Sequence, residues 1–382
     1  MGKTILFNLE STQPSISGKR HGGGIYGEIL FKRMVELNAD MAAFYTSEKW
    51  MNPDILRVIR ENNIPLYDLK GRTLQDLVAE IKPRLFYSAM MDVYDFGPEV
   101  ATLGTLHGLR LIELPHDPLM LRYPGNPLSH RVKHYVEPFL PSLVFRFNRS
   151  RYYSYIPKQD FVVVSNHTAN AVREFFPEKA DADIKVFYSP STTAEIPLDE
   201  AKVADYPYFL MVSGNRWEKN ILRAIIAFEK LFDQGKLDGF MVHITGLSSL
   251  DEIRYKYRHP HRFKALGYVD DSELQRQYRD AYAFLYPTLN EGFGYPPLEA
   301  MRFGVPVAAS HICSIPEVCG ESVLYFNPMK IDEIAGAIEM LTRPEIRERL
   351  KAEGFERYEY ITARQKSDLD ALARYIIEKA KE

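Results

Sequence analysis

The sequence predicts an α/β protein with two domains, each built around a parallel β-sheet that helices cover on both faces. Three observations support this fold class. The 382 residues are enough for two α/β domains of ordinary size. Short apolar runs alternate with amphipathic segments along the chain, which is the βαβ pattern of parallel sheets. A stretch rich in Ser, Pro, Thr and charged residues, 189–204, interrupts this alternation and is the best candidate for a linker.

The first half of the chain contains the strands and helices of the first predicted sheet. Ser165 is well placed to cap a helix that runs to Phe176, because a serine hydroxyl accepts a hydrogen bond from the N–H groups at a helix start. Periodicity predicts the other helices at 28–37, 55–61 and 74–80. The predicted strands span 4–8, 42–45, 84–88, 108–114, 161–164 and 185–188.

Glycines precede the first of these helices. Gly22, Gly24 and Gly27 match the spacing G-x-G-x-x-G. A dinucleotide fingerprint follows its strand directly, whereas a loop of about a dozen residues intervenes in this chain. We therefore interpret residues 22–27 as a glycine loop that lets a substrate approach the helix N-terminus. A flexible surface loop is the alternative.

A His-Asp pair, His116 and Asp117, follows the predicted strand 108–114. Parallel sheets bind ligands at the carboxyl ends of their strands, and an imidazole there can move a proton or bind a substrate hydroxyl. The alternative is a histidine that only fixes a loop.

The stretch 122–158 combines basic and aromatic side chains with a single acid, Glu137. This composition suits an anionic membrane surface or an acidic acceptor. It equally suits single-stranded nucleic acid, whose bases stack on aromatic rings. A solvated helix face with its aromatics turned into the core is the third interpretation. The basic residues are Arg122, Arg131, Lys133, Arg146, Arg149, Arg151 and Lys158.

The second half of the chain repeats the alternation of strands and helices. Asn220 is predicted to cap the helix 221–232, and Gly304 to end the helix before the strand 305–309. Further helices are predicted at 272–281, 331–342, 346–358 and 368–381, and further strands at 208–212, 241–245, 263–267, 281–286 and 323–326.

Two turns in this half place charged residues beside helix N-termini. Residues 290–301, Asn-Glu-Gly-Phe-Gly-Tyr-Pro-Pro-Leu-Glu-Ala-Met, connect a strand to a helix in which Pro297 suits the first position. The N–H groups and the dipole at a helix start bind phosphate. Arg216 and Lys219 precede another helix start, where two cations suit a diphosphate. Glu299 falls in the first turn of the helix predicted to begin at Pro297. Two roles are therefore available to it, capping this helix or binding a ligand.

Six short motifs follow one another in this half of the chain, and the first half adds three looser ones at 22–25, 116–117 and 163–166. In their order, the six resemble those of retaining glycosyltransferases of the GT-B fold, specifically glycosyltransferase family 4. In that family the arginine usually stands just after the glycine or beside the lysine, and Arg216 occupies neither position. The motifs are Gly-x-x-x-x-Lys-Asn (214–220), Leu-Gly-Tyr-Val (266–269), Tyr-Pro-Thr (286–288), Glu-Gly-Phe-Gly-x-Pro-x-Leu-Glu-Ala-Met (291–301), Gly-Val-Pro-Val (304–307) and Ile-Pro-Glu-Val (315–318).

The resemblance implies two Rossmann-like domains facing across a cleft. Residues 1–190 would form an acceptor-binding domain, residues 191–365 a nucleotide-sugar-binding domain, and residues 366–382 a helix that packs back on the first domain. It also implies a retaining glycosyltransferase that moves a hexose from a nucleoside-diphosphate sugar, of the GDP-mannose or UDP-hexose type. The acceptor would be a glycan or a lipid-linked molecule in bacterial polysaccharide synthesis.

The resemblance further implies a role for each matching residue. Glu291 would face the hydroxyls of the donor sugar and His116 would lie near the sugar and the acceptor, so these two are the candidate catalytic residues. No cofactor or metal is expected, because cations and helix N-termini can stabilise the departing diphosphate and no Asp-x-Asp motif is present. The candidate donor-binding residues are Gly23 and Gly24, Arg216 and Lys219 for the diphosphate, Tyr268 and Val269 for the base, Gly292, Phe293, Gly294 and Tyr295 for sugar and phosphate, and Glu299 for the ribose.

Composition excludes several other classes of protein. The formal charge of −3 gives no general attraction to nucleic acid. Two cysteines, Cys313 and Cys319, do not make a disulfide framework and fit a reducing compartment. Neither a secretion signal nor an apolar run long enough for a membrane helix is present. We therefore expect a cytoplasmic protein, either free or peripheral on the cytosolic face of the membrane.

Two alternative functions stay open. One is a nucleotide-sugar epimerase on the same scaffold, and the other is a nucleic-acid-binding module that uses residues 122–158. A glycoside hydrolase is disfavoured, because Glu291 and Glu299 lie on either side of an anion-binding turn and not on opposite faces of a glycosidic bond.

Overall fold

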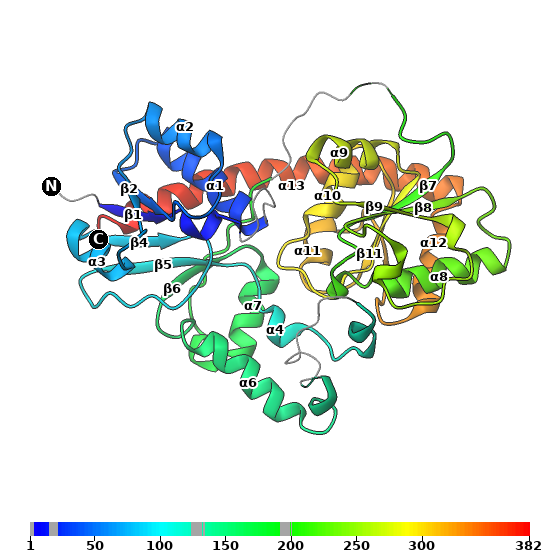
Figure 1. Ribbon diagram of the computed structural model, residues 1–382, viewed down its shortest axis with the longest axis horizontal. Helices are drawn as coiled ribbons and strands as arrows, with labels where there is room; N and C mark the ends of the chain where they lie inside the picture. The colour runs from blue at the N-terminus through cyan, green and yellow to red at the C-terminus, as the bar shows by residue number, and fades with distance from the viewer. Residues whose placement is uncertain (1–3, 15–21, 124–131, 133, 192–198, 200) are drawn as a thin grey trace. The chain divides into compact units, whose positions relative to one another are not determined.

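The chain forms two compact units (Figure 1). The computed structural model describes residues 4–14, 22–123, 132, 134–191, 199 and 201–382. Unit 1 comprises residues 1–109, 149–192 and 362–382, and unit 2 comprises residues 110–148 and 193–361. Within the described ranges, no helix is both long and apolar enough to cross a bilayer.

Unit 1 is built on six parallel strands in the order β3-β2-β1-β4-β5-β6. In the centre, Ile5 of β1 lies opposite Met41 of β2 on one side and Leu85 of β4 on the other. All residues of β1 and β4 are buried, which explains why both strands are mostly apolar and do not alternate. The strands are β1 Ile5–Asn8, β2 Met41–Tyr45, β3 Leu66–Asp68, β4 Leu85–Ser88, β5 Ala101–Leu106 and β6 Asp160–Val163.

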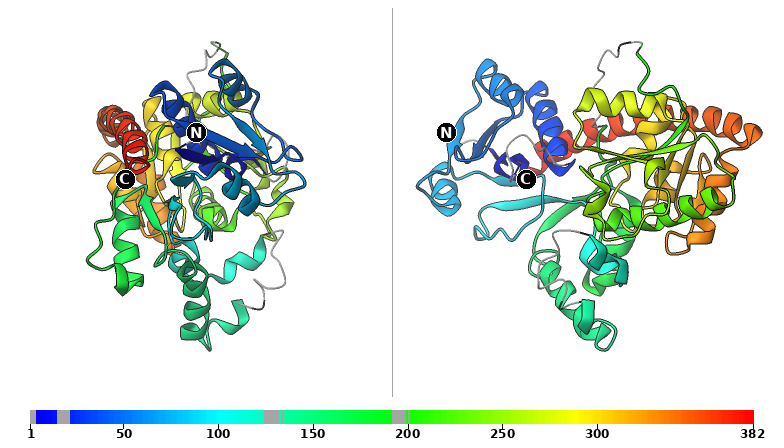
Figure 2. Two further views of the ribbon diagram at one scale, coloured as in Figure 1. Left: turned by 90° about the vertical axis from the view of Figure 1, so that its left-hand side faces the viewer. Right: turned by 45° about the vertical axis from the view of Figure 1, so that its right-hand side comes forward.

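Helices flank the strands of unit 1 on both faces (Figure 2). Side-chain caps determine where several of them begin. Asn52 caps α2, Thr73 and Asp76 form a capping box on α3, and Ser165 accepts the Thr168 N–H at the start of α7, as predicted. The helices are α1 Gly22–Glu36, α2 Pro53–Glu61, α3 Leu74–Ile81 and α7 Asn166–Phe175, together with the end of α6 (Pro141–Tyr153) and the last part of α13 (Pro344–Lys379).

Unit 2 contains a second six-stranded parallel sheet, in the order β12-β11-β10-β7-β8-β9. Its core lies between this sheet and helix α8, whose predicted apolar stripe is buried. The strands are β7 Tyr208–Met211, β8 Met241–Thr245, β9 Phe263–Gly267, β10 Ala283–Tyr286, β11 Val307–Ser310 and β12 Leu324–Phe326. The helices are α4 Arg110–Glu113, α8 Ile221–Asp233, α9 Asp271–Asp280, α10 Tyr295–Arg302, α11 Ile315–Cys319 and α12 Ile331–Met340, with 3-10 turns at Pro118–Arg122 (η2) and Trp217–Lys219 (η4).

The prediction of a strand at 108–114 is wrong. The strand in this region is β5, and the extended chain stops at Gly108, which has a φ of 135°. Residues 110–113 then form the short helix α4. His116 therefore does not directly follow a strand. The strand predicted at 185–188 contributes only an isolated parallel bridge between Val186 and Val163.

The interpretation of residues 22–27 as a loop is also wrong, because they form the first turns of α1. Gly27 has a packing role in this helix. A Cβ at this position would lie 2.7 Å from Thr12 Cγ2 and 2.8 Å from Ala89 Cβ. The missing side chain therefore lets α1 approach these two residues closely.

The two helices predicted at 346–358 and 368–381 are one helix, α13, since residues 355–379 contain no glycine or proline to interrupt it. The part from residue 362 onward belongs to unit 1. Asp370 Oδ1 lies 2.6 Å from Arg33 Nε, and Lys379 Nζ lies 2.9 Å from Asp160 Oδ2. Gln365 Nε2 donates to Ser189 O at 2.6 Å.

Residues 110–148 group with unit 2, whereas the sequence analysis assigns them to the N-terminal domain. Contacts with α8 explain this grouping. The carboxylate of Asp117 pairs with the guanidinium of Arg223 at 2.6 and 2.9 Å. The hydroxyl of Tyr123 accepts the N–H of Leu222 at 2.8 Å and so satisfies one backbone donor in the first turn of α8.

Candidate functional site

The turn between β10 and α10 is held in one conformation by its neighbours in unit 2. The hydroxyl of Ser314 contacts two backbone carbonyls of the turn, Glu291 O at 3.0 Å and Phe293 O at 2.8 Å. Gly294 has a φ of 106°, and a Cβ there would lie 2.6 Å from Ile315 Cδ1. Helix α10 then begins at Tyr295, two residues before the predicted first position. A glycine is therefore required at 294 by both backbone conformation and space.

The loop after β7 brings Lys219 to the same place. Residues 217–219 form the 3-10 turn η4, and Asn220 follows in the left-handed conformation with a φ of 58°. The N–H of Leu289 donates to Glu218 O at 2.8 Å, which ties this loop to the residues after β10. Asn220 precedes α8 as predicted, but its side chain does not cap the helix. Its Nδ2 instead donates to the carbonyls of Pro287 and Pro328, at 2.9 and 2.8 Å.

Three donors converge on one oxygen of Glu291. Lys219 Nζ lies 2.5 Å from Glu291 Oε1, the Tyr286 hydroxyl 2.6 Å and the Thr288 hydroxyl 2.9 Å. Lys219 Nζ also donates to the Tyr286 hydroxyl at 2.9 Å. Within the described part of the chain, no hydrogen bond is made to the other carboxylate oxygen, Glu291 Oε2. The carboxylate is thus oriented through one oxygen, which leaves the second for a ligand.

The electrostatic environment keeps Glu291 ionised. The side chain of Lys219 is 7% exposed and that of Glu291 is 16% exposed. Burial alone would raise the pKa of Glu291, but the positive charge of Lys219 and the three hydrogen bonds outweigh it and lower that pKa. Burial raises the pKa of the Tyr286 phenol far above its ordinary value, so Tyr286 remains a hydrogen-bond donor.

Arg216 does not contact Glu291 but pairs with Glu218. Its Nη2 and Nε lie 2.6 and 3.0 Å from Glu218 Oε1, and Arg110 Nη1 lies 3.1 Å from the same oxygen. Burial acts to raise the pKa of Glu218, and the two guanidinium groups overcome this effect and lower it. Arg216 itself is 46% exposed, so that its guanidinium remains accessible beside the turn.

The other predicted donor-binding residues of unit 2 occupy loops and a helix start around the sheet. Tyr268 and Val269 follow β9, and the Tyr268 side chain is 66% exposed. Glu299 lies in the second turn of α10, not in the first, where it would cap. Burial raises the pKa of Tyr278 strongly, and the neighbouring Glu299 carboxylate, which shares a hydrogen bond with this phenol, raises it further. Gly23 and Gly24 belong to α1 in unit 1.

His116 is accompanied by a second histidine and a carboxylate. Its Nδ1 lies 3.1 Å from Glu137 Oε2, and its ring stacks on His134 with 4.4 Å between the centroids. Burial lowers the pKa of His134, and the adjacent His116 lowers it further. The neighbouring Asp117 is buried with Arg223, at 1% and 9% side-chain exposure, so that it supports the segment structurally.

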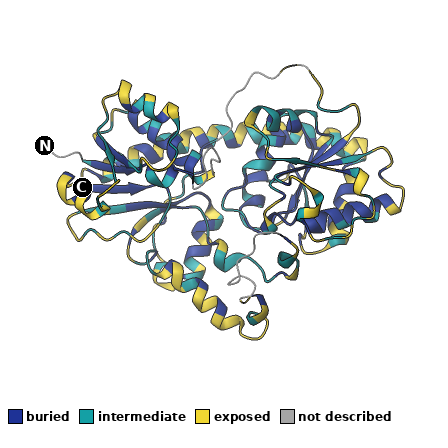
Figure 3. Ribbon diagram, viewed as in Figure 1, coloured by how far each residue is buried: buried dark blue, intermediate teal, exposed yellow. Residues whose placement is uncertain are grey.

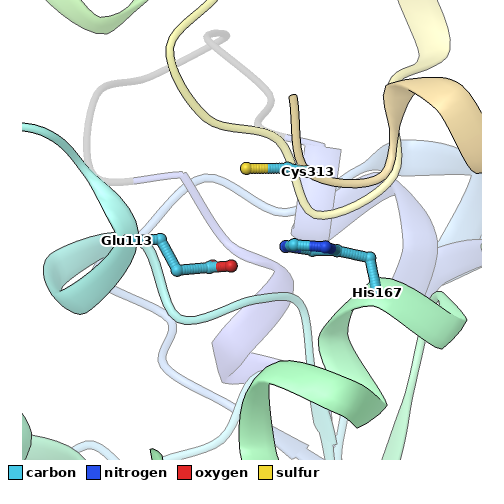
Figure 4. Close-up of side chains that lie close together, drawn as sticks. All are labelled: Glu113, His167 and Cys313. Carbon is cyan, nitrogen blue, oxygen red and sulfur yellow. The ribbon is translucent and has the colours of Figure 1, made fainter. Parts of the chain in front are cut away.

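Figure 4 labels Glu113, Cys313 and His167. Glu113 and Cys313 belong to unit 2, where Asn290 Nδ2 contacts Glu113 Oε2 at 3.4 Å and Cys313 Sγ at 3.2 Å. Asn290 is buried directly before Glu291, so this amide anchors the start of the turn. His167 belongs to helix α7 of unit 1.

Sequence reasoning missed several residues that build this site. The residues that orient the Glu291 carboxylate are Tyr286 and Thr288, and both stand in the Tyr-Pro-Thr motif that the resemblance contains. That motif was the signal that could have identified them. No sequence pattern identified Glu218 and Arg110 as site residues. Charged residues are common in loops, and the pairing of these two depends on the fold.

Comparisons with known proteins show which families and folds this chain resembles. Residues 193–357 match the family model described as Glycosyl transferases group 1. The O-antigen chain mannosyltransferase B of Escherichia coli is 36% identical over 132 residues, which are 34% of this chain and 27% of that protein. The structure of sucrose-phosphate synthase from Thermosynechococcus elongatus aligns with a TM-score of 0.64 and 15% identity over 97% of both chains. Anabaena Alr3699/HepE in complex with UDP-glucose aligns with a TM-score of 0.60 and 14% identity over 99% of both chains.

Together, the fold and the matches identify the class of protein. The two parallel sheets and the structural likeness show two Rossmann-like domains of the GT-B type, which confirms the predicted fold class. The family match then assigns residues 193–357, the part that carries Lys219 and Glu291, to the Glycosyl transferases group 1 domain. The resemblance to GT-B glycosyltransferases is thereby confirmed.

Proposed function

We propose that this protein is a glycosyltransferase that moves a hexose from a nucleoside-diphosphate sugar to a glycan or lipid-linked acceptor in bacterial polysaccharide synthesis. The match of residues 193–357 supports the reaction class. The likeness to an O-antigen mannosyltransferase favours mannose, and therefore a GDP-mannose donor, while the likeness to a protein bound to UDP-glucose keeps a UDP-hexose open. Both cysteines are free thiols, which fits a cytoplasmic location.

One observation carries this proposal: the orientation of Glu291 by Lys219, Tyr286 and Thr288 through a single oxygen. Glu291 Oε2 can then accept hydrogen bonds from hydroxyls of the donor sugar. Lys219 has three N–H donors and uses two of them on Glu291 and Tyr286, so the third can bind a phosphate oxygen. The sugar and the diphosphate would be held by two side chains that are already fixed to each other.

The proposed chemistry follows from these groups. The bond between the anomeric carbon and the diphosphate oxygen breaks, and the acceptor oxygen bonds to the same face of that carbon, with retention of configuration. The proton of the acceptor hydroxyl passes to the departing phosphate. Lys219, Arg216 and the positive end of α10 would stabilise the negative charge of the nucleoside diphosphate without a metal.

The remaining roles are part of the same proposal. Glu299 would bind the ribose, Tyr268 and Val269 would border the base, and His116 would lie near the sugar and the acceptor. Gly23 and Gly24 would allow the donor to approach α1. Because the phenol of Tyr278 shares a hydrogen bond with the Glu299 carboxylate, it would orient that carboxylate.

The test is donor hydrolysis and transfer across a panel of nucleotide sugars, with the anomeric configuration of the product read by NMR. We expect turnover with a nucleoside-diphosphate hexose and loss of turnover in Glu291→Gln. Glu321→Gln, at an exposed position after α11, is the matched control for the loss of one carboxylate. No turnover or hydrolysis with any nucleotide sugar would overturn the proposal.

A thermal-shift series separates the alternatives, because a ligand that binds the folded state raises the unfolding midpoint. We expect stabilisation by GDP or UDP and none by oligonucleotides. Stabilisation by oligonucleotides alone would favour the nucleic-acid-binding module. Interconversion of nucleotide sugars without transfer or release of the nucleotide would favour the epimerase.

A further inference from the structure

Large hydrophobic side chains are exposed in one short segment of unit 2. Phe139 is 84% exposed, Leu140 52%, Leu143 60% and Phe147 63%. Among the described residues, eight of the fifteen exposed large hydrophobic residues lie between 132 and 153, and the other seven are scattered over the rest of the chain. Single exposed apolar residues are normal on a protein surface, but a cluster of this kind marks an interaction site. Much of α6 is accordingly coloured as exposed in Figure 3.

Helical geometry gathers these side chains into a row. Leu143 and Phe147 are four residues apart on α6, the spacing of one helix face, and Phe139 and Leu140 lie directly before the first residue of the helix. Three other residues of α6 face the protein: Val144, Asn148 and Tyr152 are buried at 6 to 7% exposure. Asn148 Nδ2 donates to Leu111 O at 2.6 Å, which anchors the helix. Buried residues therefore anchor α6, while the side chains of Leu143 and Phe147 remain largely exposed.

The charges on the same helix are positive. Arg146 and Arg151 are exposed, and neither guanidinium has a carboxylate partner within the described ranges. Arg149 pairs with Glu178 at 3.7 Å. The acid that precedes the helix, Glu137, is bonded to His116. Arg131 and Lys133, which the sequence analysis counted in this basic stretch, lie outside the described residues.

We infer that the α6 face, defined as Phe139 and Leu140 directly before α6 together with Leu143, Arg146 and Phe147 of the helix, docks the protein on an anionic lipid bilayer. A helix lying in a membrane interface buries its apolar row at the boundary between headgroups and acyl chains and places basic residues at the anionic headgroups. The α6 face presents both parts at once. This inference goes beyond the proposed function and requires no donor or acceptor.

Two other occupants fit the same face less well. A second copy of the chain would pack this face against itself, and because the face carries Arg146 but no carboxylate, the interface would enclose arginines without an acidic partner from the same face. Single-stranded nucleic acid would use the arginines and the rings of Phe139 and Phe147. Leu140 and Leu143 have no aromatic ring on which a base could stack, whereas a bilayer buries them as readily as the phenylalanines.

The test is co-sedimentation of the full chain with vesicles. We expect binding to vesicles of phosphatidylglycerol mixed with phosphatidylethanolamine, weakening as ionic strength rises, and no binding to neutral phosphatidylcholine vesicles. Arg146→Gln removes one headgroup contact and should lower the partition coefficient by about fivefold. The double variant Leu143→Ser/Phe147→Ser should lower it by at least about tenfold. All three positions are exposed, and circular dichroism and thermal unfolding check that the variants fold.

Matched controls come from α13 and the segment before it. Phe355→Ser/Tyr360→Ser removes two side chains that are 46% and 59% exposed, and Arg343→Gln removes an exposed arginine. These variants should bind vesicles as the native chain does. The inference is overturned if the native chain ignores anionic vesicles, or if Leu143→Ser/Phe147→Ser binds them equally well. It is also overturned if light scattering shows that this double variant only dissociates a dimer, or if oligonucleotides and not vesicles bind through the α6 face.

Discussion

Lys219 Nζ lies 2.5 Å from Glu291 Oε1, so that the loop after β7 and the turn after β10 are joined by a largely buried ion pair. The two residues are 72 positions apart in sequence. The pair orients the carboxylate, and the ammonium lowers its pKa. Four predictions follow from this pair and from the contacts that support its surroundings.

Lys219→Met should lower the free energy of unfolding by about 3 kcal/mol, because it leaves a buried carboxylate without its counter-ion. Glu291→Gln in the same chain should restore part of this loss, since the uncompensated charge disappears. Urea denaturation of the native chain, both single variants and the double variant gives the coupling energy, which we expect to exceed about 1 kcal/mol. Strictly additive single effects would show that the two side chains do not interact in solution.

Tyr286→Phe should move the acid limb of the pH profile of donor binding to higher pH. The Tyr286 hydroxyl donates to the ionised carboxylate and so helps to hold the pKa of Glu291 below its ordinary value of 4.5. Without this donor the pKa rises, and the carboxylate is protonated at a higher pH. A hydrogen bond to a charged group of this kind contributes about 1.5–3 kcal/mol.

The lowered pKa of Glu291 also determines how the stability of the protein depends on pH. Because the pKa of Glu291 is lower in the folded state than its ordinary value of 4.5, ionisation of this carboxylate stabilises the folded protein. The full contribution is present at pH values above 4.5, and it is lost as the pH falls through the folded-state pKa. The matched control is Tyr325→Phe, which removes a hydroxyl that donates to Gly320 O at 2.5 Å on another part of unit 2. Identical pH profiles for the two variants would contradict the role of Tyr286.

Arg223→Met should destabilise the protein by about 3–5 kcal/mol, because it strands the fully buried carboxylate of Asp117. It should also loosen residues 117–123 from α8, which hydrogen exchange would report as faster exchange of the Leu222 amide. Lys230→Met is the control, since it breaks an exposed pair with Asp332 and should cost no more than about 1 kcal/mol. Similar losses in the two variants would show that the Asp117–Arg223 pair is not buried.

Gly294→Ala should destabilise the turn before α10 and weaken donor binding. The backbone there has a φ of 106°, and a Cβ would lie 2.6 Å from Ile315 Cδ1. We expect a loss of at least about 1–2 kcal/mol from the strained conformation, measured by thermal or chemical unfolding. Gly336→Ala is the opposite case, because this glycine lies inside α12 with nothing within 4 Å of the added Cβ. It should stabilise the protein by about 0.5–1 kcal/mol, and a loss there equal to that of Gly294→Ala would contradict the packing argument.

Local patterns predicted most of the strands and helices because each has a continuous apolar run or a clear cap. β1, β4 and β10 are short apolar runs that the sheet buries on both faces, and Ser165 caps α7 as its position indicated. The errors occur where local signals compete. Leu109 to Leu114 is apolar enough for a strand, but the φ of Gly108 ends the extended chain first. The glycines at 22–27 suggested a loop, although close packing of Gly27 against Thr12 favours a helix.

Residue type and local spacing were enough to predict the two-domain α/β fold and to identify charged residues beside helix N-termini, including Lys219 and Glu291. These features depend on residue type and on spacing within about a dozen positions, which the linear chain displays directly. The side-chain contacts of the site could not be predicted in this way: Lys219, Tyr286 and Thr288 donate to the same oxygen of Glu291, Arg216 pairs with Glu218, and Asp117 is buried with Arg223. Lys219 follows β7, whereas Tyr286, Thr288 and Glu291 lie at the end of β10 or just after it, and these paired parallel strands bring the four residues together only once the chain has folded. Asp117 and Arg223 are likewise 106 positions apart in sequence.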